Sequence, residues 1–219
     1  MKELLDFWIE STPNLLDGLI VSLQVTAVIL AIGIPFGLLL ALGVESKNKF
    51  TKWFSLFAVE VGRGAPALVL LQFAYFGLPP VGITLSSFSA TVLALAWNTA
   101  AYTSEIIRAG IDAVPHGEKE AAASMCFSKI DTLRFVVLPQ GLRVAAPALL
   151  GFAVLMLQAT SLSFTVALPE LTSQAHIIGS STFKYMAILS YAGIMYASIC
   201  IPATILVSVL EKQLGKHTI

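Results

Sequence analysis

The sequence predicts an all-α integral membrane protein, and three observations support this fold class. Hydrophobic residues make up 57% of the 219 positions and charged residues only 12%, whereas soluble domains carry about 25% charged residues. The mean hydropathy is +0.84. The charged residues also cluster, which leaves uncharged runs at 18–44, 64–104, 144–169 and 185–210. A spanning helix needs about 20 apolar residues, so each run is long enough to cross a bilayer.

The run 64–104 is too long for one crossing, and the turn-forming segment GLPPVG at 77–82 interrupts it. We therefore expect five transmembrane helices in one membrane domain over 17–210, followed by a tail at 211–219. The expected helices cover about 17–43, 53–78, 87–110, 140–160 and 185–210.

The first residues predict a short interfacial helix at 1–16. Apolar residues such as Leu5 and Trp8 alternate there with charged residues such as Glu3 and Asp6, a pattern typical of helices that lie on a membrane surface. Acidic residues precede any apolar core, and no small-residue cleavage site follows. The segment is therefore not expected to be a cleavable signal peptide.

The distribution of basic residues predicts the orientation. Ten of the thirteen Lys and Arg residues lie in 44–52, 105–143 and 211–219, only Lys2 and Lys184 lie in the other loops, and Arg63 lies in a span. The positive-inside rule then places the N-terminus outside and the C-terminus in the cytoplasm.

The loop at 111–139, between the third and fourth spans, is a polar and helix-forming island. Pro115 suits a helix start, and Ser128-x-x-Asp131 reads as a capping box that begins a second short helix. Pro139 is expected to stop this helix from running unbroken into the next span. Two short helices at an angle would form a knob that docks into another protein, or an amphipathic connector on the membrane.

The island resembles the cytoplasmic coupling loop of importer-type ABC permeases. The EAA motif of that loop matches Glu120, Ala121 and Ala122, and its Val-x-Leu-Pro element matches 136–139. Cys126 stands where the family has glycine. Because a cysteine is less free than glycine to adopt φ > 0, we expect a tighter or differently angled turn.

Four further segments resemble the polar amino-acid branch of these permeases. The resemblance covers about 15–210 of this chain. They are RGAP at 63–66, AYTSEI at 101–106, LPQGLR at 138–143 and QATSL at 158–162.

The resemblance implies a membrane-spanning subunit of an ATP-driven importer in the bacterial cytoplasmic (inner) membrane. It would carry a polar amino acid or an amino-acid-like compound, of the histidine, glutamine, arginine, glutamate or opine type. The implied partners are ABC ATPase subunits, a second permease subunit in a heterodimer or homodimer, an extracytoplasmic solute-binding protein and membrane lipid. The residues implied in coupling to the ATPase are Glu120, Ala121, Ala122, Cys126, Leu138 and Pro139.

Two charged residues, Glu60 and Arg63, lie inside the second expected span at i,i+3 spacing. Charges in a bilayer pair with one another, face protein or line a water-filled path. The pair is therefore either a structural ion pair against a neighbouring helix or part of a gate. Pro66 would kink or unwind the helix and free carbonyl groups for a cavity.

The candidate substrate path comprises polar residues of two spans: Gln158, Thr160, Ser161, Asn98 and Thr99. Asn98 and Thr99 have the alternative role of interhelical hydrogen bonding. Many relatives carry Lys-Asp at 158–159, where an Asp could meet the ammonium group of an amino acid. Ala159 cannot do this, so a second permease subunit would supply the anchor, or specificity would rest with the external receptor.

The sequence also argues against catalysis by this chain. It holds no G-x-x-x-x-G-K-[ST] phosphate loop and no Gly-x-Ser-x-Gly element, and its three histidines show no metal-ligand spacing. We expect no bound cofactor or metal and no nucleic acid, with ATP and Mg²⁺ held by the partner ATPase. Two other functions are weighed: a self-sufficient secondary transporter or channel, for which Glu60 is the one fair coupling carboxylate, and a membrane scaffold that recruits a cytoplasmic partner.

Overall fold

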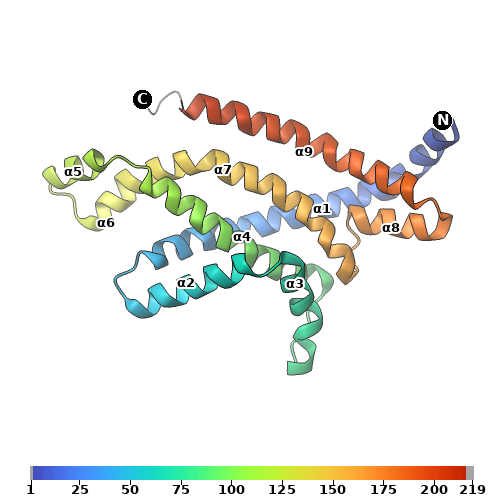
Figure 1. Ribbon diagram of the computed structural model, residues 1–219, viewed down its shortest axis with the longest axis horizontal. Coiled ribbons are helices and arrows are strands. Elements are labelled where there is room, and N and C mark those ends of the chain that lie inside the picture. The colour runs from blue at the N-terminus through green and yellow to red at the C-terminus, as the bar shows by residue number, and fades with distance from the viewer. Residues whose placement is uncertain (1, 216–219) are drawn as a thin grey trace. The chain divides into compact units, whose positions relative to one another are not determined.

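The computed structural model describes residues 2–215, with side chains to residue 213, and every regular element in this stretch is helical (Figure 1). The predicted all-α class is confirmed. The helices are α1 Lys2–Val44, α2 Lys49–Gly64, α3 Ala67–Gln72, α4 Ser87–Asp112, α5 His116–Ser124, α6 Lys129–Asp131, α7 Leu138–Ala159, α8 Leu171–Thr182 and α9 Tyr185–Gly215.

The chain divides into two compact units. Unit 1 comprises Met1–Ala31, Ala65–Trp97 and Ala153–Thr204. Unit 2 comprises Ile32–Gly64, Asn98–Phe152 and Ile205–Ile219. The last four residues of the expected tail, and Lys216 with them, lie outside the described residues.

Three described helical stretches are long and apolar enough to cross a membrane: Lys2–Val44, Lys129–Val166 and Tyr185–Gln213. The pair Lys49–Gly64 and Ala67–Gly77 makes a fourth if an interrupted helix counts as one span. α4 forms a helix where the third span is expected. Uncharged polar residues such as Asn98 and Ser104 lower its hydropathy, as do the charged residues of its C-terminal part. The five-span topology stays a prediction.

Residues 2–16 do not form a separate helix, because α1 continues unbroken from Lys2 to Val44. Trp8 contacts protein within unit 1, whereas Leu5 and Ile9 are 50% and 70% exposed. The Trp8 indole N–H donates to the Ala187 carbonyl at 3.0 Å and its ring stacks on Tyr191 with centroids 4.9 Å apart. The Thr12 hydroxyl also pairs with the Tyr191 hydroxyl at 2.8 Å. These contacts hold one side of the segment against α9, and its interfacial position on the membrane stays a prediction.

The helix at 49–72 breaks at Pro66, as the sequence predicts. α2 ends at Gly64 and α3 begins at Ala67. Because Pro66 has no N–H, the carbonyl of Gly62 loses its i+4 donor. The Asn98 side-chain amide of α4 donates to this carbonyl at 2.8 Å instead. The freed carbonyl is thus capped by a neighbouring helix of unit 2.

Pro139 does not stop the helix that precedes it, and this expectation is wrong. Residues 129–166 form one helical stretch, in which Thr132–Val137 is π-helical and α7 follows directly. A π-turn shifts the hydrogen-bond register by one residue. We infer that this shift accommodates the missing N–H of Pro139 without ending the helix.

The core of unit 1 lies where α8 packs beside the N-terminal part of α1 and the start of α9 (Figure 1). Its buried residues are Leu15, Leu171, Ala175, Ile188, Ala192 and Met195. This packing fixes the N-terminus of α8 against α1 and α9.

Candidate coupling surface and transport pocket

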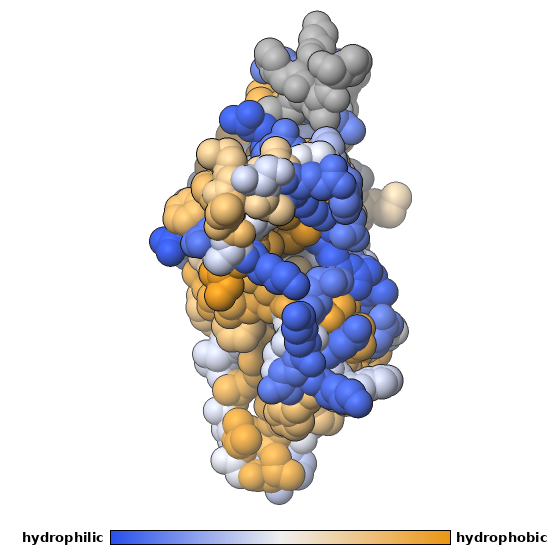
Figure 2. Space-filling model, turned by 90° about the vertical axis from the view of Figure 1, so that its left-hand side faces the viewer, coloured by the Kyte–Doolittle hydropathy of each residue, from blue (hydrophilic) through white to orange (hydrophobic). Residues whose placement is uncertain are grey.

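Residues 113–137 of unit 2 form a compact knob, and we use this name for them below. Val114, Ala122 and Val137 are buried in it, so the EAA segment turns its second alanine inward. Glu120 points outward, with 70% of its side chain exposed, and its carboxylate lies 3.0 Å from His116 Nδ1. The end of unit 2 that carries α5 and α6 is rich in hydrophilic side chains, with apolar ones beside them (Figure 2). The knob is therefore helical, small and exposed.

The turn after α5 closes in the manner of a glycine-ended helix, although Cys126 replaces the glycine. Cys126 adopts φ = 61°. Its N–H donates to the Ala123 carbonyl at 3.0 Å, and the Phe127 N–H donates to the Ala122 carbonyl at 3.1 Å. These two bonds define the Schellman motif. The expectation that the cysteine would alter the turn is wrong, because its backbone accepts the left-handed conformation.

The second short helix of the knob begins at the predicted capping box. The Asp131 N–H donates to Ser128 Oγ at 3.2 Å, and the Ser128 hydroxyl donates to the Asp131 carboxylate at 2.6 Å. Large apolar side chains remain exposed in this polar segment, among them Met125 at 71%, Ile130 at 75% and Phe135 at 60%. Such side chains are typical of a surface that another protein covers.

The neck of the knob is narrow because two glycines meet there. A Cβ built on Gly110 of α4 would collide with the Gly141 carbonyl, and one on Gly141 of α7 would lie 2.9 Å from Ile111 Cα. The Gln140 side-chain amide also donates to the Glu118 carboxylate at 2.8 Å. α4, α5 and α7 are thereby held together at the base of the knob.

The predicted pair of Glu60 and Arg63 is part of a larger charge cluster in unit 2. The Arg63 guanidinium lies 3.5 Å from the Glu60 carboxylate and 3.5 Å from that of Glu105 on α4. Arg108 lies 3.0 Å from the same Glu105. Arg63 therefore joins α2 to α4, which supports the structural interpretation of this pair. Arg63 Nε is buried without a hydrogen-bond partner among the described residues.

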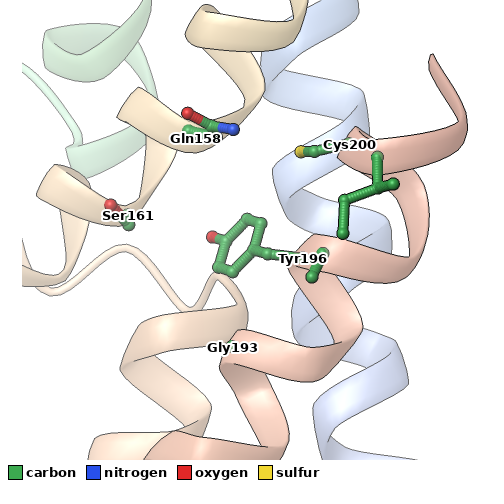
Figure 3. Close-up of a pocket in the computed structure, with 7 residues that line it drawn as sticks. Gln158, Ser161, Gly193, Tyr196 and Cys200 are labelled. Atoms are coloured by element: carbon green, nitrogen blue, oxygen red, sulfur yellow. The ribbon is translucent and has the colours of Figure 1, made fainter. Parts of the chain in front are cut away.

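Unit 1 holds a cavity of about 360 Å³ between the end of α7 and α9 (Figure 3). Gln158 and Ser161, two of the predicted path residues, lie on one side and face Tyr196 and Cys200 on the other. Its other lining residues are Gly193, Ala197 and Ile201. Pockets for small molecules start near 300 Å³, so one amino acid is of suitable size.

The other predicted path residues do not line this cavity. Thr160 is fully buried, and its hydroxyl donates to the Leu157 carbonyl at 2.6 Å. The Asn98 side-chain amide already donates a hydrogen bond to the Gly62 carbonyl. Thr99 is fully buried, and its hydroxyl has no partner among the described residues.

Glu170 is the site residue that sequence reasoning missed. It is fully buried and caps the N-terminus of α8, where its carboxylate accepts the N–H groups of Thr172 at 2.8 Å and Ser173 at 2.7 Å. The Tyr196 hydroxyl donates to it at 2.9 Å. Burial raises the pKa of Glu170, and these three hydrogen bonds oppose the rise. The available signal was that no other acidic residue occurs between Val144 and Leu210.

Comparison with known proteins identifies the family. Residues 33–216 match the model of the binding-protein-dependent transport system inner membrane component. The chain belongs to this family. The permease is 35% identical over 209 residues to the probable amino-acid ABC transporter permease protein YckA of Bacillus subtilis, covering 95% of this chain and 92% of the relative. It is 33% identical over 210 residues to the histidine/lysine/arginine/ornithine transport system permease protein HisM of Escherichia coli, covering 91% and 88%.

The solved structure of an amino acid ABC transporter with histidines matches the permease with a TM-score of 0.88 and 36% identity, covering 94% of this chain and 96% of that one. The MetNI methionine ABC transporter matches with a TM-score of 0.66 at 20% identity, covering 90% and 96%, and this second match shows the shared fold only. The protein is thus a permease subunit of an amino-acid ABC importer.

Proposed function

We propose that the permease couples amino-acid translocation to a separate ATPase through the knob at 113–137. The observation that carries this proposal is the exposure of Glu120, Met125 and Ile130 on a short helical segment with a narrow neck. An exposed carboxylate beside bare apolar side chains suits a groove in a partner protein. Because Gly110 and Gly141 pack closely at the neck, a displaced knob would carry α4 and α7 with it.

The same proposal includes the membrane arrangement and the partners. Five spans cross the bacterial inner membrane with the N-terminus outside, which places the knob in the cytoplasm. An extracytoplasmic solute-binding protein delivers the solute, and a second permease subunit completes the pathway. ATP and Mg²⁺ are held by the ATPase.

The cavity lined by Gln158, Ser161 and Tyr196 is the proposed station for the solute in unit 1. Its described lining residues are uncharged, with polar groups from Gln158 and Ser161 on one wall and from Tyr196 on the other. The names of the relatives point to amino acids, so we propose a polar amino acid or an amino-acid-like compound as the solute.

Replacing Glu120 by Lys tests the coupling proposal. The substitution reverses the charge of an exposed side chain, so the permease is expected to insert and fold normally. Co-purification of the ATPase with the permease from detergent-solubilised membranes should fall at least about tenfold, the effect of losing one charge-assisted contact of about 1.4 kcal/mol, and solute uptake should be lost.

Glu45→Lys is the matched control, because Glu45 is also exposed and lies in the short loop after α1 that is expected to face the cytoplasm. Its ATPase yield and uptake should stay at the wild-type level. Wild-type uptake by Glu120→Lys would reject the knob as the coupling element. Uptake that needs an ion gradient and no ATP would favour a secondary transporter instead.

A further inference from the structure

A hydrogen-bond network behind the cavity joins three helices of unit 1. The Tyr196 hydroxyl of α9 donates to Glu170 Oε2 at 2.9 Å and lies 3.4 Å from the Ser22 hydroxyl of α1. Ser22 also accepts the Leu171 N–H of α8 at 3.3 Å. Glu170 is fully buried, whereas Tyr196 lines the cavity (Figure 3). Tyr196 is therefore the member of this network that a solute in the cavity meets.

The hydrogen bonds of Glu170 determine whether the Tyr196 hydroxyl can donate or accept a hydrogen bond with a solute. Both carboxylate oxygens already accept hydrogen bonds, Oε1 from the Ser173 N–H and Oε2 from the Thr172 N–H and Tyr196. A phenol has one proton, and here that proton points to Glu170. The Tyr196 oxygen can therefore meet a solute only through its lone pairs, as an acceptor.

The charges around Glu170 also favour a cation as the ligand of the cavity. Among the described residues, no Lys, Arg or His lies within salt-bridge distance of Glu170. Its negative charge is balanced only by hydrogen bonds and by the positive end of α8. None of the described residues that line the cavity is charged. A cation that enters there would meet the Tyr196 oxygen as an acceptor. Because this hydroxyl donates a hydrogen bond to the buried Glu170 carboxylate, its contact with the cation would be charge-assisted.

We propose that Glu170 is a positioning residue that fixes the Tyr196 hydroxyl as an acceptor, so that the cavity takes the protonated amine, or a similar N–H cation, of the transported solute. This inference rests on the proposed function of the cavity. It also changes the expectation drawn from Ala159. The chain carries an anchor for the ammonium group, located on α8 and α9 instead of at the Lys-Asp position of its relatives.

Cys200 allows a test that needs no identified solute, because its thiol side chain lines the same cavity. The intact transporter in membranes is treated with cationic 2-aminoethyl methanethiosulfonate or with neutral methyl methanethiosulfonate. Peptide mass spectrometry gives the modification rates of Cys200 and of Cys126. The exposed Cys126 lies in unit 2 and supplies the reference for the intrinsic reactivity of each reagent. The readout is the ratio of cationic to neutral rate at Cys200, divided by the same ratio at Cys126.

We expect this normalised ratio to be highest in the wild type and to fall roughly tenfold in Tyr196→Phe, which corresponds to one charge-assisted hydrogen bond. Glu170→Gln should lower it similarly, because the tyrosine proton loses its carboxylate acceptor. Tyr191→Phe is the matched control. Tyr191 lies on the same helix and pairs with Thr12 outside the cavity, so this change should leave the ratio unaltered.

Glu170→Gln also weakens the cap of α8, and it is therefore not the deciding variant. Tyr196→Phe leaves both backbone bonds of Glu170 in place and decides the question alone. An unchanged ratio in Tyr196→Phe would overturn the proposal, as would a Cys200 that reacts with neither reagent. Either result leaves the ATPase-coupling proposal standing, because that proposal is judged on the Glu120→Lys co-purification.

Discussion

At the scale of single residues, Cys126 adopts a left-handed backbone conformation that glycine usually occupies. The Schellman bonds of its own N–H and of Phe127 hold the turn after α5. The left-handed conformation costs an L-residue about 1–2 kcal/mol, and glycine avoids this cost. The knob is therefore built on a turn that its own sequence strains locally.

Replacing Cys126 by Gly should raise the free energy of unfolding by about 1 kcal/mol, because relief of the left-handed strain exceeds the extra chain entropy of glycine. Thermal unfolding of the purified permease in detergent measures the change. Cys126→Ala is the control, since it removes the thiol but keeps the Cβ, and should bring no gain. Equal midpoints for the Gly and Ala variants would contradict the argument.

At the scale of helices, α2 and α4 are joined by groups that the break at Pro66 makes available. Asn98 caps the Gly62 carbonyl at 2.8 Å, and the Tyr102 hydroxyl reaches the Arg63 carbonyl at 3.4 Å. Arg63 adds its contact with Glu105. The guanidinium is 33% exposed and the carboxylate 28%, so this pair contributes only modestly to stability. The buried amide contact is the stronger link.

Asn98→Leu should lower the free energy of unfolding by about 1–3 kcal/mol, because the Gly62 carbonyl is then buried without a donor. Chemical denaturation in detergent, followed by tryptophan fluorescence, measures the loss. Tyr102→Phe serves for comparison, since its hydroxyl bond is long and its side chain is 40% exposed. A loss from Tyr102→Phe that equals that from Asn98→Leu would count against the capping role.

At the scale of the whole molecule, bare apolar side chains indicate a lipid environment. On α9, Ile201, Ile205 and Leu206 are each about 60% exposed, at 59%, 61% and 61%. Each would cost roughly 25 cal/mol per Å² of exposed apolar area in water, whereas lipid removes that cost. The knob of unit 2 is polar instead, which fits its proposed position outside the bilayer.

The predicted orientation places the exposed Cys126 in the cytoplasm. A membrane-impermeant maleimide should label Cys126 in inside-out vesicles and leave it unlabelled in intact cells. Labelling in denatured membranes supplies the total. Labelling of Cys126 in intact cells would show that the topology is the opposite of the predicted one. The knob would then lie on the side of the membrane where no ATP is available.

The sequence by itself determined the all-helical class, the position of the knob, the break at Pro66 and the capping box at Ser128. These features depend on local properties, namely hydropathy over about 20 residues, the missing N–H of proline and a side chain within three residues of its partner. The resemblance carried by Glu120, Ala121 and Ala122 supplied the family, which the comparisons confirm.

Only the tertiary structure decided how α1 continues through its first residues, how Pro139 is accommodated and which side chains meet in the cavity. Trp8 with Ala187, Asn98 with Gly62, and Glu170 with Tyr196 are pairs distant in the chain. Their energies depend on which helices pack together, and local pattern carries no information about that choice. For the same reason the buried Glu170 was not found from the sequence. Its importance comes from the tyrosine of another helix that it holds in place.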